Sequence, residues 1–323
     1  MKSIAFFNNK GGVGKTTLLC NVAGYLAHYN KLKICVVDAD PQCNATQYFF
    51  PDNTIEKIYG PKGSFTIHSV IEPLSLGEGY SKDIEVRRSP SFKVDVIPGD
   101  PRLALTEDLL ARDWGDAKAG EIRGIRTNLV FSALLEQLDD YDLVLFDASP
   151  SLGALNRAIL LSADYFISPM SIDIFSLKAF ENIAEWIHNW STDWERGLAN
   201  VKNKNRVPDL KYGRAAFLGY VTQQYMAKRD SSGQRRAVQA YETIRSQIDA
   251  IIDNSFSASA RPAKPYEMGT VPNLFSLIPM SQSSHKPIFE LQAKDGIVGA
   301  HFQKVKDAKE IFAEVADELV KRI

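Results

Sequence analysis

The sequence predicts an α/β fold in which a doubly wound, mostly parallel sheet carries helices on both faces. Short apolar runs of the length of buried strands recur along the chain, at residues 4–7, 34–37, 94–97, 143–146, 165–167, 217–221 and 274–278. Segments with helical spacing of apolar residues lie between them, for example at 18–27 and 311–319. This alternation of strand and helix favours parallel strands joined by crossover helices. In such sheets ligands bind at the carboxyl ends of the strands.

The composition is that of an ordinary globular protein with a sizeable core. The 323 residues are 45% hydrophobic and 24% charged, which argues against disorder. No low-complexity linker interrupts the alternation, so we expect one domain spanning residues 1–323. Three stretches rich in Pro, Gly, Ser or charge do not fit the pattern and are interpreted as loops or small insertions, near 51–92, 196–213 and 254–272.

The first apolar run leads directly into a glycine-rich loop. Residues 8–17 read Asn-Asn-Lys-Gly-Gly-Val-Gly-Lys-Thr-Thr and are followed by a helical pattern. Strand, glycine-rich loop and helix form the context of a P-loop, whose backbone N–H groups face phosphate oxygens. We therefore expect Lys15 to reach the β and γ phosphates of ATP and the Thr16 hydroxyl to bind Mg²⁺. The nucleotide-binding residues predicted here are Gly11, Gly12, Val13, Gly14, Lys15, Thr16 and Thr17.

Carboxylates follow two further apolar runs. Asp38 and Asp40 end the second run, and alternation along a strand places them on the same side of the sheet before Pro41 ends the strand. Asp147 ends the fourth run, as the acid of a Walker B strand does. Two carboxylates such as Asp38 and Asp40 beside a phosphate site suit Mg²⁺ and a water molecule, and Asp147 is the expected metal-side acid.

These motifs together resemble the ParA/MinD family of deviant Walker A ATPases, and ParA/Soj-type partition ATPases most of all. Lys-Gly-Gly-Val-Gly-Lys-Thr at 10–16 matches the deviant loop, in which Lys10 is an additional lysine. Residues 38–46 resemble the D-x-D-P-Q-x-N-A-T switch, and 147–153 resemble D-x-x-P-S-L-G. The resemblance implies that Lys10 crosses a dimer interface to the partner's phosphates, that Asp40 positions the attacking water, and that Asp38 and Asp147 support the metal.

The same resemblance implies a place for the adenine. In relatives the base lies between a strand that here ends near Gln223 and a loop that here follows Pro279. Many relatives carry a basic residue after that proline, whereas this chain has Met280. By this resemblance, the expected adenine contacts are Gln223, Pro279 and Met280.

Two functions remain open at this stage. One is a partition ATPase for a plasmid or chromosome: ATP closes a homodimer, the dimer binds DNA without sequence preference, and a ParB-like or other partner stimulates slow hydrolysis. The net charge of −1 provides no global attraction to DNA, so binding needs local basic groups, and the candidates are Lys202, Lys204, Arg206, Lys228, Arg229, Arg235 and Arg236. The alternative is a ParA-like regulatory ATPase that acts on a protein partner of a defence, secretion or conjugation system without binding DNA.

Other members of the wider lineage fit less well. A membrane-surface switch needs a basic amphipathic C-terminal helix, but the tail carries Glu310, Glu314, Asp317 and Glu318, which favours a helix packed on the domain. Cys20, Cys35 and Cys43 lack the spacing of a redox pair or metal site. With no signal-peptide or membrane-spanning segment in sight, we expect a cytoplasmic protein, associated with the nucleoid if it binds DNA.

Overall fold

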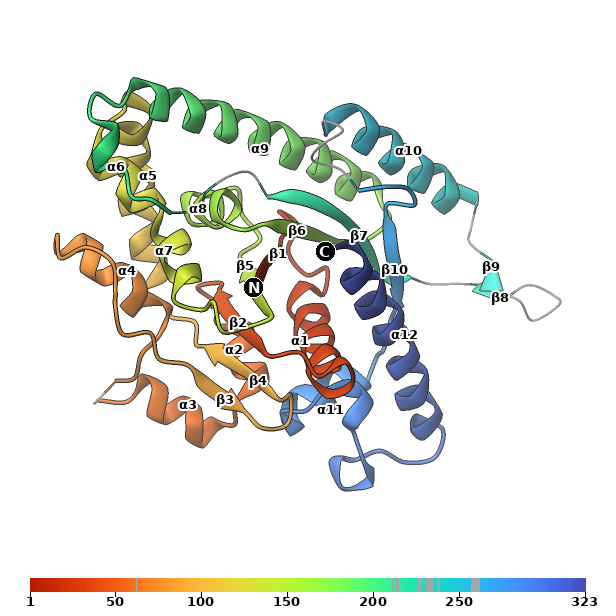
Figure 1. The fold of residues 1–323 in the computed structure, drawn as a ribbon. Coiled ribbons are helices and arrows are strands. Elements are labelled where there is room, and N and C mark those ends of the chain that lie inside the picture. The colour runs from red at the N-terminus through yellow and green to blue at the C-terminus, as the bar shows by residue number, and fades with distance from the viewer. Residues whose placement is uncertain are drawn as a thin grey trace.

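The computed structural model describes the chain except residues 62, 211, 213–214, 226–227, 230–234, 237–238 and 257–261, and it does not describe the side chains of 224–242. An eight-stranded sheet runs through the molecule in the order β10-β7-β6-β1-β5-β2-β4-β3 (Figure 1). Neighbouring strands are parallel except β3, which pairs antiparallel with β4. The strands are β1 (Lys2–Phe6), β2 (Ile34–Ala39), β3 (Arg87–Ser89), β4 (Val94–Ile97), β5 (Leu143–Ala148), β6 (Tyr165–Met170), β7 (Ala216–Tyr225) and β10 (Glu267–Pro272).

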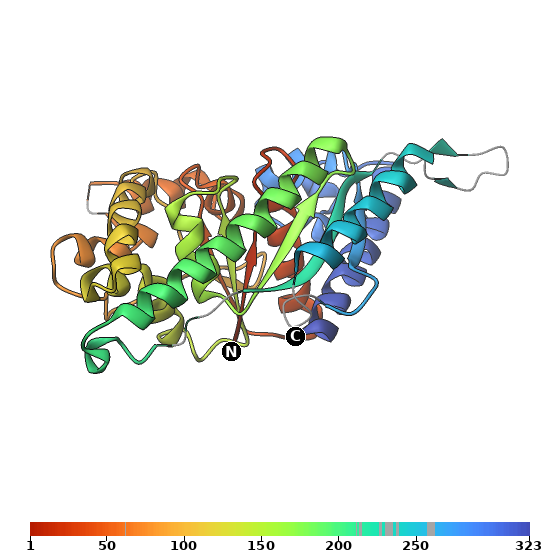
Figure 2. The ribbon, with the colours of Figure 1, turned by 90° about the horizontal axis from the view of Figure 1, so that it is seen from above.

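Helices cover both faces of the sheet, as Figures 1 and 2 show, so the predicted fold class is confirmed. One face carries α1 (Lys15–Tyr25), α2 (Asn44–Phe49), α3 (Asp52–Tyr59), α11 (Leu277–Ser284) and α12 (His301–Arg322). The other carries α4 (Ile67–Ser75), α5 (Leu103–Ala119), α6 (Ile122–Asn128), α7 (Val130–Glu136), α8 (Ala154–Ser162), α9 (Ile174–Asn200) and α10 (Gln239–Ser255). Short turns of other helix types are η1 (Leu26–Asn30), η2 (Lys204–Arg206), η3 (Ile288–Glu290) and η4 (Ala293–Asp295).

Two hydrophobic cores result, one on each face. In β1, Ile4 and Phe6 pack in the core beneath α1 and α12, whereas Ala5 packs in the core beneath α5–α10. All three side chains are fully buried. A strand covered on both faces is apolar at successive positions, which is why these strands appear in the sequence as continuous apolar runs.

The expectation of a strand at 274–278 is wrong. The last strand of the sheet is β10, inside the stretch 254–272 for which the sequence predicts a loop or small insertion, and helix α11 begins at Leu277. Buried Leu274 and Leu277 stand three residues apart, with Phe275 exposed between them, which is helical spacing. A short apolar run alone does not separate a strand from a helix. β10 contains Gly269, where an added Cβ would lie 2.8 Å from Val315 of α12. Because α12 leaves no room for a side chain there, the sequence has glycine where an apolar residue would have indicated a strand.

The other two irregular stretches also contain regular structure. Residues 51–92 include α3, α4 and β3, while 196–213 include the end of α9 and η2. Two further strands, β8 (Lys228–Arg229) and β9 (Arg235–Arg236), pair with each other outside the main sheet. Their basic side chains lie outside the described part of the structure.

The C-terminal helix packs on the domain, as its acidic polar side suggested. Phe312, Val315 and Leu319 of α12 are buried in the core on the α1 face. Arg322 donates to the carbonyl oxygens of Leu218 at 2.7 Å and Pro265 at 2.8 Å, which ties the end of α12 to β7 and to the segment before β10. Among the helices that the structure describes, none combines the length and the apolar character needed to cross a membrane.

Candidate nucleotide site

The glycine-rich loop connects β1 to α1 at the carboxyl edge of the sheet. Gly12 and Gly14 have φ of 75° and 85°, a left-handed conformation that glycine adopts without steric cost. No heavy atom lies within 4 Å of where a Cβ would stand on Gly11 or Gly12, so a ligand can approach this backbone closely. The Asn8 side chain fixes the entry to the loop, because it donates to the Pro169 carbonyl of β6 and accepts from the Lys10 N–H at 2.9 Å.

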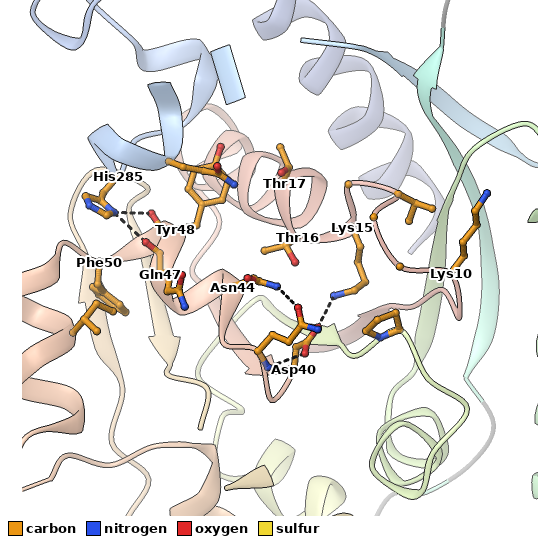
Figure 3. Close-up of a pocket in the computed structure, with 18 of the residues that line it drawn as sticks. Lys10, Lys15, Thr16, Thr17, Asp40, Asn44, Gln47, Tyr48, Phe50 and His285 are labelled. Atoms are coloured by element: carbon orange, nitrogen blue, oxygen red, sulfur yellow. Dashed lines mark hydrogen bonds and ion pairs between the residues drawn. The ribbon is translucent and has the colours of Figure 1, made fainter. Parts of the chain in front are cut away.

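A cavity of about 790 Å³ opens beside this loop (Figure 3). Its walls come from the loop, from the segment that follows β2, from the start of α3, and from the end of α11. The lining residues are residues 10–17, Asp40, Gln42, Asn44, Gln47, Tyr48, Phe50, Asp52, Ile55, Pro150, Gln282 and His285. The predicted phosphate-binding residues thus line one continuous cavity together with Asp40.

Lys15 and Thr16 meet the Walker B acid at the base of the cavity. The Lys15 ammonium contacts the Asp147 carboxylate and lies 4.0 Å from Asp40 Oδ2. The Thr16 hydroxyl donates to Asp147 Oδ2 at 2.8 Å. Asp147 stands opposite Asp38 in the parallel register of β5 and β2. The structure therefore brings together all four side chains that the sequence assigned to phosphate and metal.

Asp38 is fully buried and anchors the switch segment. It accepts from the Thr46 N–H at 2.8 Å and from the Thr46 hydroxyl at 2.6 Å. Burial raises the pKa of the Asp38 carboxyl to about 7, the nearby charge of Asp147 adds to the increase, and the Thr46 bonds oppose it. Burial likewise raises the pKa of Asp40, which accepts from the Gln42 N–H at 3.0 Å.

These acids fit a divalent cation that is held jointly with a nucleotide. Buried carboxylates that repel one another are stabilised by a nearby cation. Within the described residues, however, no three His, Cys, Asp or Glu side chains form a metal cage. Mg²⁺ commonly takes only one or two protein ligands and completes its shell with substrate phosphates and water. Thr16, Asp38 and Asp147 match that mode of binding.

Lys10 lines the cavity, but its ammonium is held elsewhere in the same chain. Its Nζ lies 2.6 Å from Asp173 Oδ2, 3.2 Å from Ser171 Oγ and 3.3 Å from Ser176 Oγ. Figure 3 shows Lys15 directed at Asp40, whereas Lys10 extends away from both. Sequence reasoning missed these three partners, although Asp173 precedes a helical pattern as an N-cap residue does and accepts from the Ser176 N–H at 2.9 Å.

The expected adenine contacts do not line this cavity. Gln223 is buried at β7 beside the loop, with its side-chain oxygen 3.1 Å from where a Cβ on Gly14 would stand. Pro279 and Met280 lie within α11 and not after a strand. That helix reaches the cavity through Gln282 and His285, which sequence reasoning did not single out. His285 Nδ1 is 3.1 Å from the Gln47 carbonyl and so joins α11 to α2.

Comparison with known proteins identifies the class and then the family. A family model described as an AAA domain, AAA_31, matches residues 1–199, and the chain belongs to that family. More specifically, it is a P-loop ATPase of the ParA/MinD family, as its relatives indicate.

Three relatives illustrate the extent of the similarity. The chromosome-partitioning ATPase Soj of Thermus thermophilus is 33% identical over 180 residues, which is 55% of this chain and 58% of Soj. The crystal structure of protein DIP2308 from Corynebacterium diphtheriae has a TM-score of 0.70 and 32% identity, covering 88% of this chain and 97% of that one. The structure of pNOB8 ParA bound to nonspecific DNA has a TM-score of 0.60 at 18% identity, covers 99% and 98% of the two chains, and supports the fold alone. The chain spans 52% to 63% of the length of the first curated relatives that it matches.

Proposed function

We propose that this chain is an ATP-dependent switch that hydrolyses ATP slowly as a homodimer and segregates DNA by binding it nonspecifically in the ATP state. The observation that carries the proposal is a second lysine, Lys10, at the mouth of a cavity whose base already holds Lys15. Lys15 already stands where phosphates bound by the same chain would lie. A second lysine outside that base is suited to act on another molecule's phosphates, as an arginine finger supplied in trans does.

Each side chain at the base of the cavity has a distinct task in this proposal. The ammonium of Lys15 and the N–H groups of residues 11–16 hold the phosphates, while Thr16, Asp38 and Asp147 hold Mg²⁺, which supplies charge neutralisation at the phosphates. Asp40 faces the same space, 4.0 Å from Lys15, and orients the attacking water. Burial raises the pKa of this carboxyl, which makes the carboxylate a stronger acceptor of a hydrogen bond from water than an exposed one. Gln223 remains a proposed contact of the adenine.

The DNA partner is supported by relatives and by local charge. Soj of Thermus thermophilus is a chromosome-partitioning ATPase, and the pNOB8 ParA structure is bound to nonspecific DNA. In this chain Lys202, Lys204 and Arg206 are exposed together near the end of α9. A ParB-like or other protein then stimulates hydrolysis and releases the DNA. The net charge of −1 favours the second candidate, a regulatory ATPase whose partner is a protein.

The deciding experiment measures retention of the purified protein on nonspecific duplex DNA. Wild type is tested with ATP and with ADP, and Asp40→Ala is tested with ATP, each at low and moderate salt, while light scattering reports the molar mass without DNA. We expect retention only in the ATP states and a loss of retention as salt rises, since phosphate contacts release counterions. Dimers that form with ATP but bind no DNA would favour the second candidate, in which the partner of the ATPase is a protein. No ATP-dependent dimer would contradict the proposal as a whole.

A further inference from the structure

The stretch 51–92 has no role in the site as proposed so far, yet its helix α3 reaches the site at both ends. Asp52 and Ile55, in the first turn of α3, line the nucleotide cavity. At the last residue of the helix, the Tyr59 hydroxyl donates to the Gly99 carbonyl at 2.7 Å. Gly99 follows β4 at the carboxyl edge of the sheet, and two strands, β5 and β2, lie between β4 and the strand that precedes the glycine-rich loop.

The Gly99 backbone lies directly against the metal-side carboxylate. Its N–H donates to the Thr46 hydroxyl at 2.8 Å, and that hydroxyl donates in turn to Asp38 Oδ2 at 2.6 Å. A Cβ on Gly99 would stand 2.9 Å from Asp38 Cγ and 3.0 Å from Cys43 Sγ, so the backbone packs on the carboxylate without a gap. A displacement of this backbone therefore changes both the hydrogen bond and the packing that hold Asp38.

We propose that Tyr59 is a positioning residue that fixes Asp38 through Gly99 and Thr46. Since the Thr46 oxygen accepts from the Gly99 N–H, its own proton is directed at Asp38, and Tyr59 holds the carbonyl of the same residue, Gly99. Tyr59 is 40% exposed, whereas Gly99, Thr46 and Asp38 are buried. Tyr59 can therefore be substituted without opening a cavity beside Asp38. The inference rests on the proposed role of Asp38 beside Mg²⁺ and nucleotide.

Tyr59→Phe removes only the hydroxyl and keeps the ring. The matched control is Tyr80→Phe. The Tyr80 hydroxyl of the wild type donates to the Arg126 carbonyl at 2.9 Å, on the opposite face of the sheet. Binding of a fluorescent ATPγS analogue is titrated with Mg²⁺ and, separately, with EDTA. We expect Tyr59→Phe to weaken binding about fivefold with Mg²⁺, the value of one ordinary hydrogen bond, and to leave binding in EDTA unchanged. Tyr80→Phe should match wild type in both buffers.

Thr46 provides the second arm of the test. Thr46→Val should show the magnesium-specific defect, while Thr46→Ser, which keeps the hydroxyl, should restore binding to the wild-type level. In the Thr46→Val background, Tyr59→Phe should add no further loss, because both changes break the same connection.

The outcomes separate this inference from the function on which it rests. Losses that add in the double variant, an equal loss in Mg²⁺ and EDTA, or wild-type binding by Tyr59→Phe would each overturn the positioning role alone. Wild-type protein that binds no nucleotide in either buffer would overturn the proposed function and this inference with it.

Discussion

Lys10 and Asp173 form an ion pair within one chain, with 2.6 Å between Nζ and Oδ2. Asp173 also caps α9, so its carboxylate is fixed by the helix whose first turn it closes. Ser171 and Ser176 surround the same ammonium. The turn between β6 and α9 thus provides Lys10 with a complete set of acceptors. A lysine that is to reach another subunit's phosphates must first leave these acceptors, so their strength opposes dimer formation.

Asp173→Asn should ease dimer formation. The amide keeps the size of the side chain and caps a helix as well as Asp does, but it lacks the charge that attracts Lys10. Exposed ion pairs contribute about 0.2–1 kcal/mol, and we therefore expect dimers with ATPγS at a protein concentration up to about fivefold lower. Sedimentation equilibrium measures this directly.

Asp193→Asn is the control, because Asp193 lies on the same helix and pairs with Lys118 and Arg196 away from the cavity. It should leave the concentration dependence of dimer formation unchanged. Weaker dimers in Asp173→Asn would mean that Asp173 serves the closed dimer and not the separate chain.

The two lysines of the loop should fail in different ways. Lys15 is buried at the base of the cavity, so Lys15→Ala should abolish nucleotide binding. Lys10→Ala should bind nucleotide within about twofold of wild type but lose ATP-dependent dimerisation and hydrolysis, because the group that acts in trans is missing. A fluorescent nucleotide titration and light scattering distinguish the two variants. Intact dimerisation and turnover in Lys10→Ala would refute the crossed-lysine mechanism.

Acid should remove the stability that Asp173 contributes. Partial burial by itself would raise the pKa of this carboxyl, but hydrogen bonds from Lys10, Ser171 and the Ser176 N–H prevail and lower it to about 2, against an ordinary value of 3.8. A lowered pKa in the folded state stabilises the protein above the unfolded value, and the benefit disappears as pH falls from about 4 to 2. The Asp173 side chain is 36% exposed, so the contribution is at most about 1 kcal/mol. Urea unfolding should show wild type and Asp173→Asn converging over that interval, and a constant difference would contradict the assignment.

The parts of the site that sequence reasoning predicted are those that short local motifs mark, each directly after an apolar strand. The loop at 10–17 and the carboxylates Asp38, Asp40 and Asp147 all follow apolar strands, and the parallel sheet brings the strand ends together. Alternation in β2 also placed Asp38 and Asp40 on one side, where they now lie near Lys15 and Asp147. Local pattern and sheet geometry suffice for such residues.

What sequence reasoning missed depends on contacts between distant segments. Asp173 meets Lys10 across 163 residues, and His285 meets Gln47 across 238. No spacing rule connects such positions, because the helices that carry them are placed by tertiary packing. The late strand β10 escaped notice for a related reason: α12 packs so closely on it that Gly269 stands where an apolar side chain would have marked a strand. Because the last strand is β10 and not residues 274–278, Pro279 and Met280 lie within helix α11 and not in a loop after a strand.

Asn21 connects three segments behind the nucleotide site, and its loss should destabilise the fold. It is fully buried on α1, its amide donates to Tyr48 Oη at 3.1 Å on α2, and its oxygen accepts from the Ile288 N–H at 2.8 Å. In Asn21→Ala the Ile288 N–H is left buried without an acceptor, which costs about 1–3 kcal/mol. The free energy of unfolding, measured in urea, should fall by that amount.

Asn53→Ala is the matched control for that measurement, because Asn53 is exposed on α3. Its free energy of unfolding should stay within about 0.5 kcal/mol of wild type, as for most surface substitutions. Equal effects of the two substitutions would mean that water satisfies Ile288 once the Asn21 side chain is gone. A selective loss in Asn21→Ala would show that α1 holds α2 and the segment after α11 together through this one amide. The segment that begins at Asp38 would then be held by α1 through Tyr48, in addition to the hydrogen bonds between Asp38 and Thr46 at the cavity.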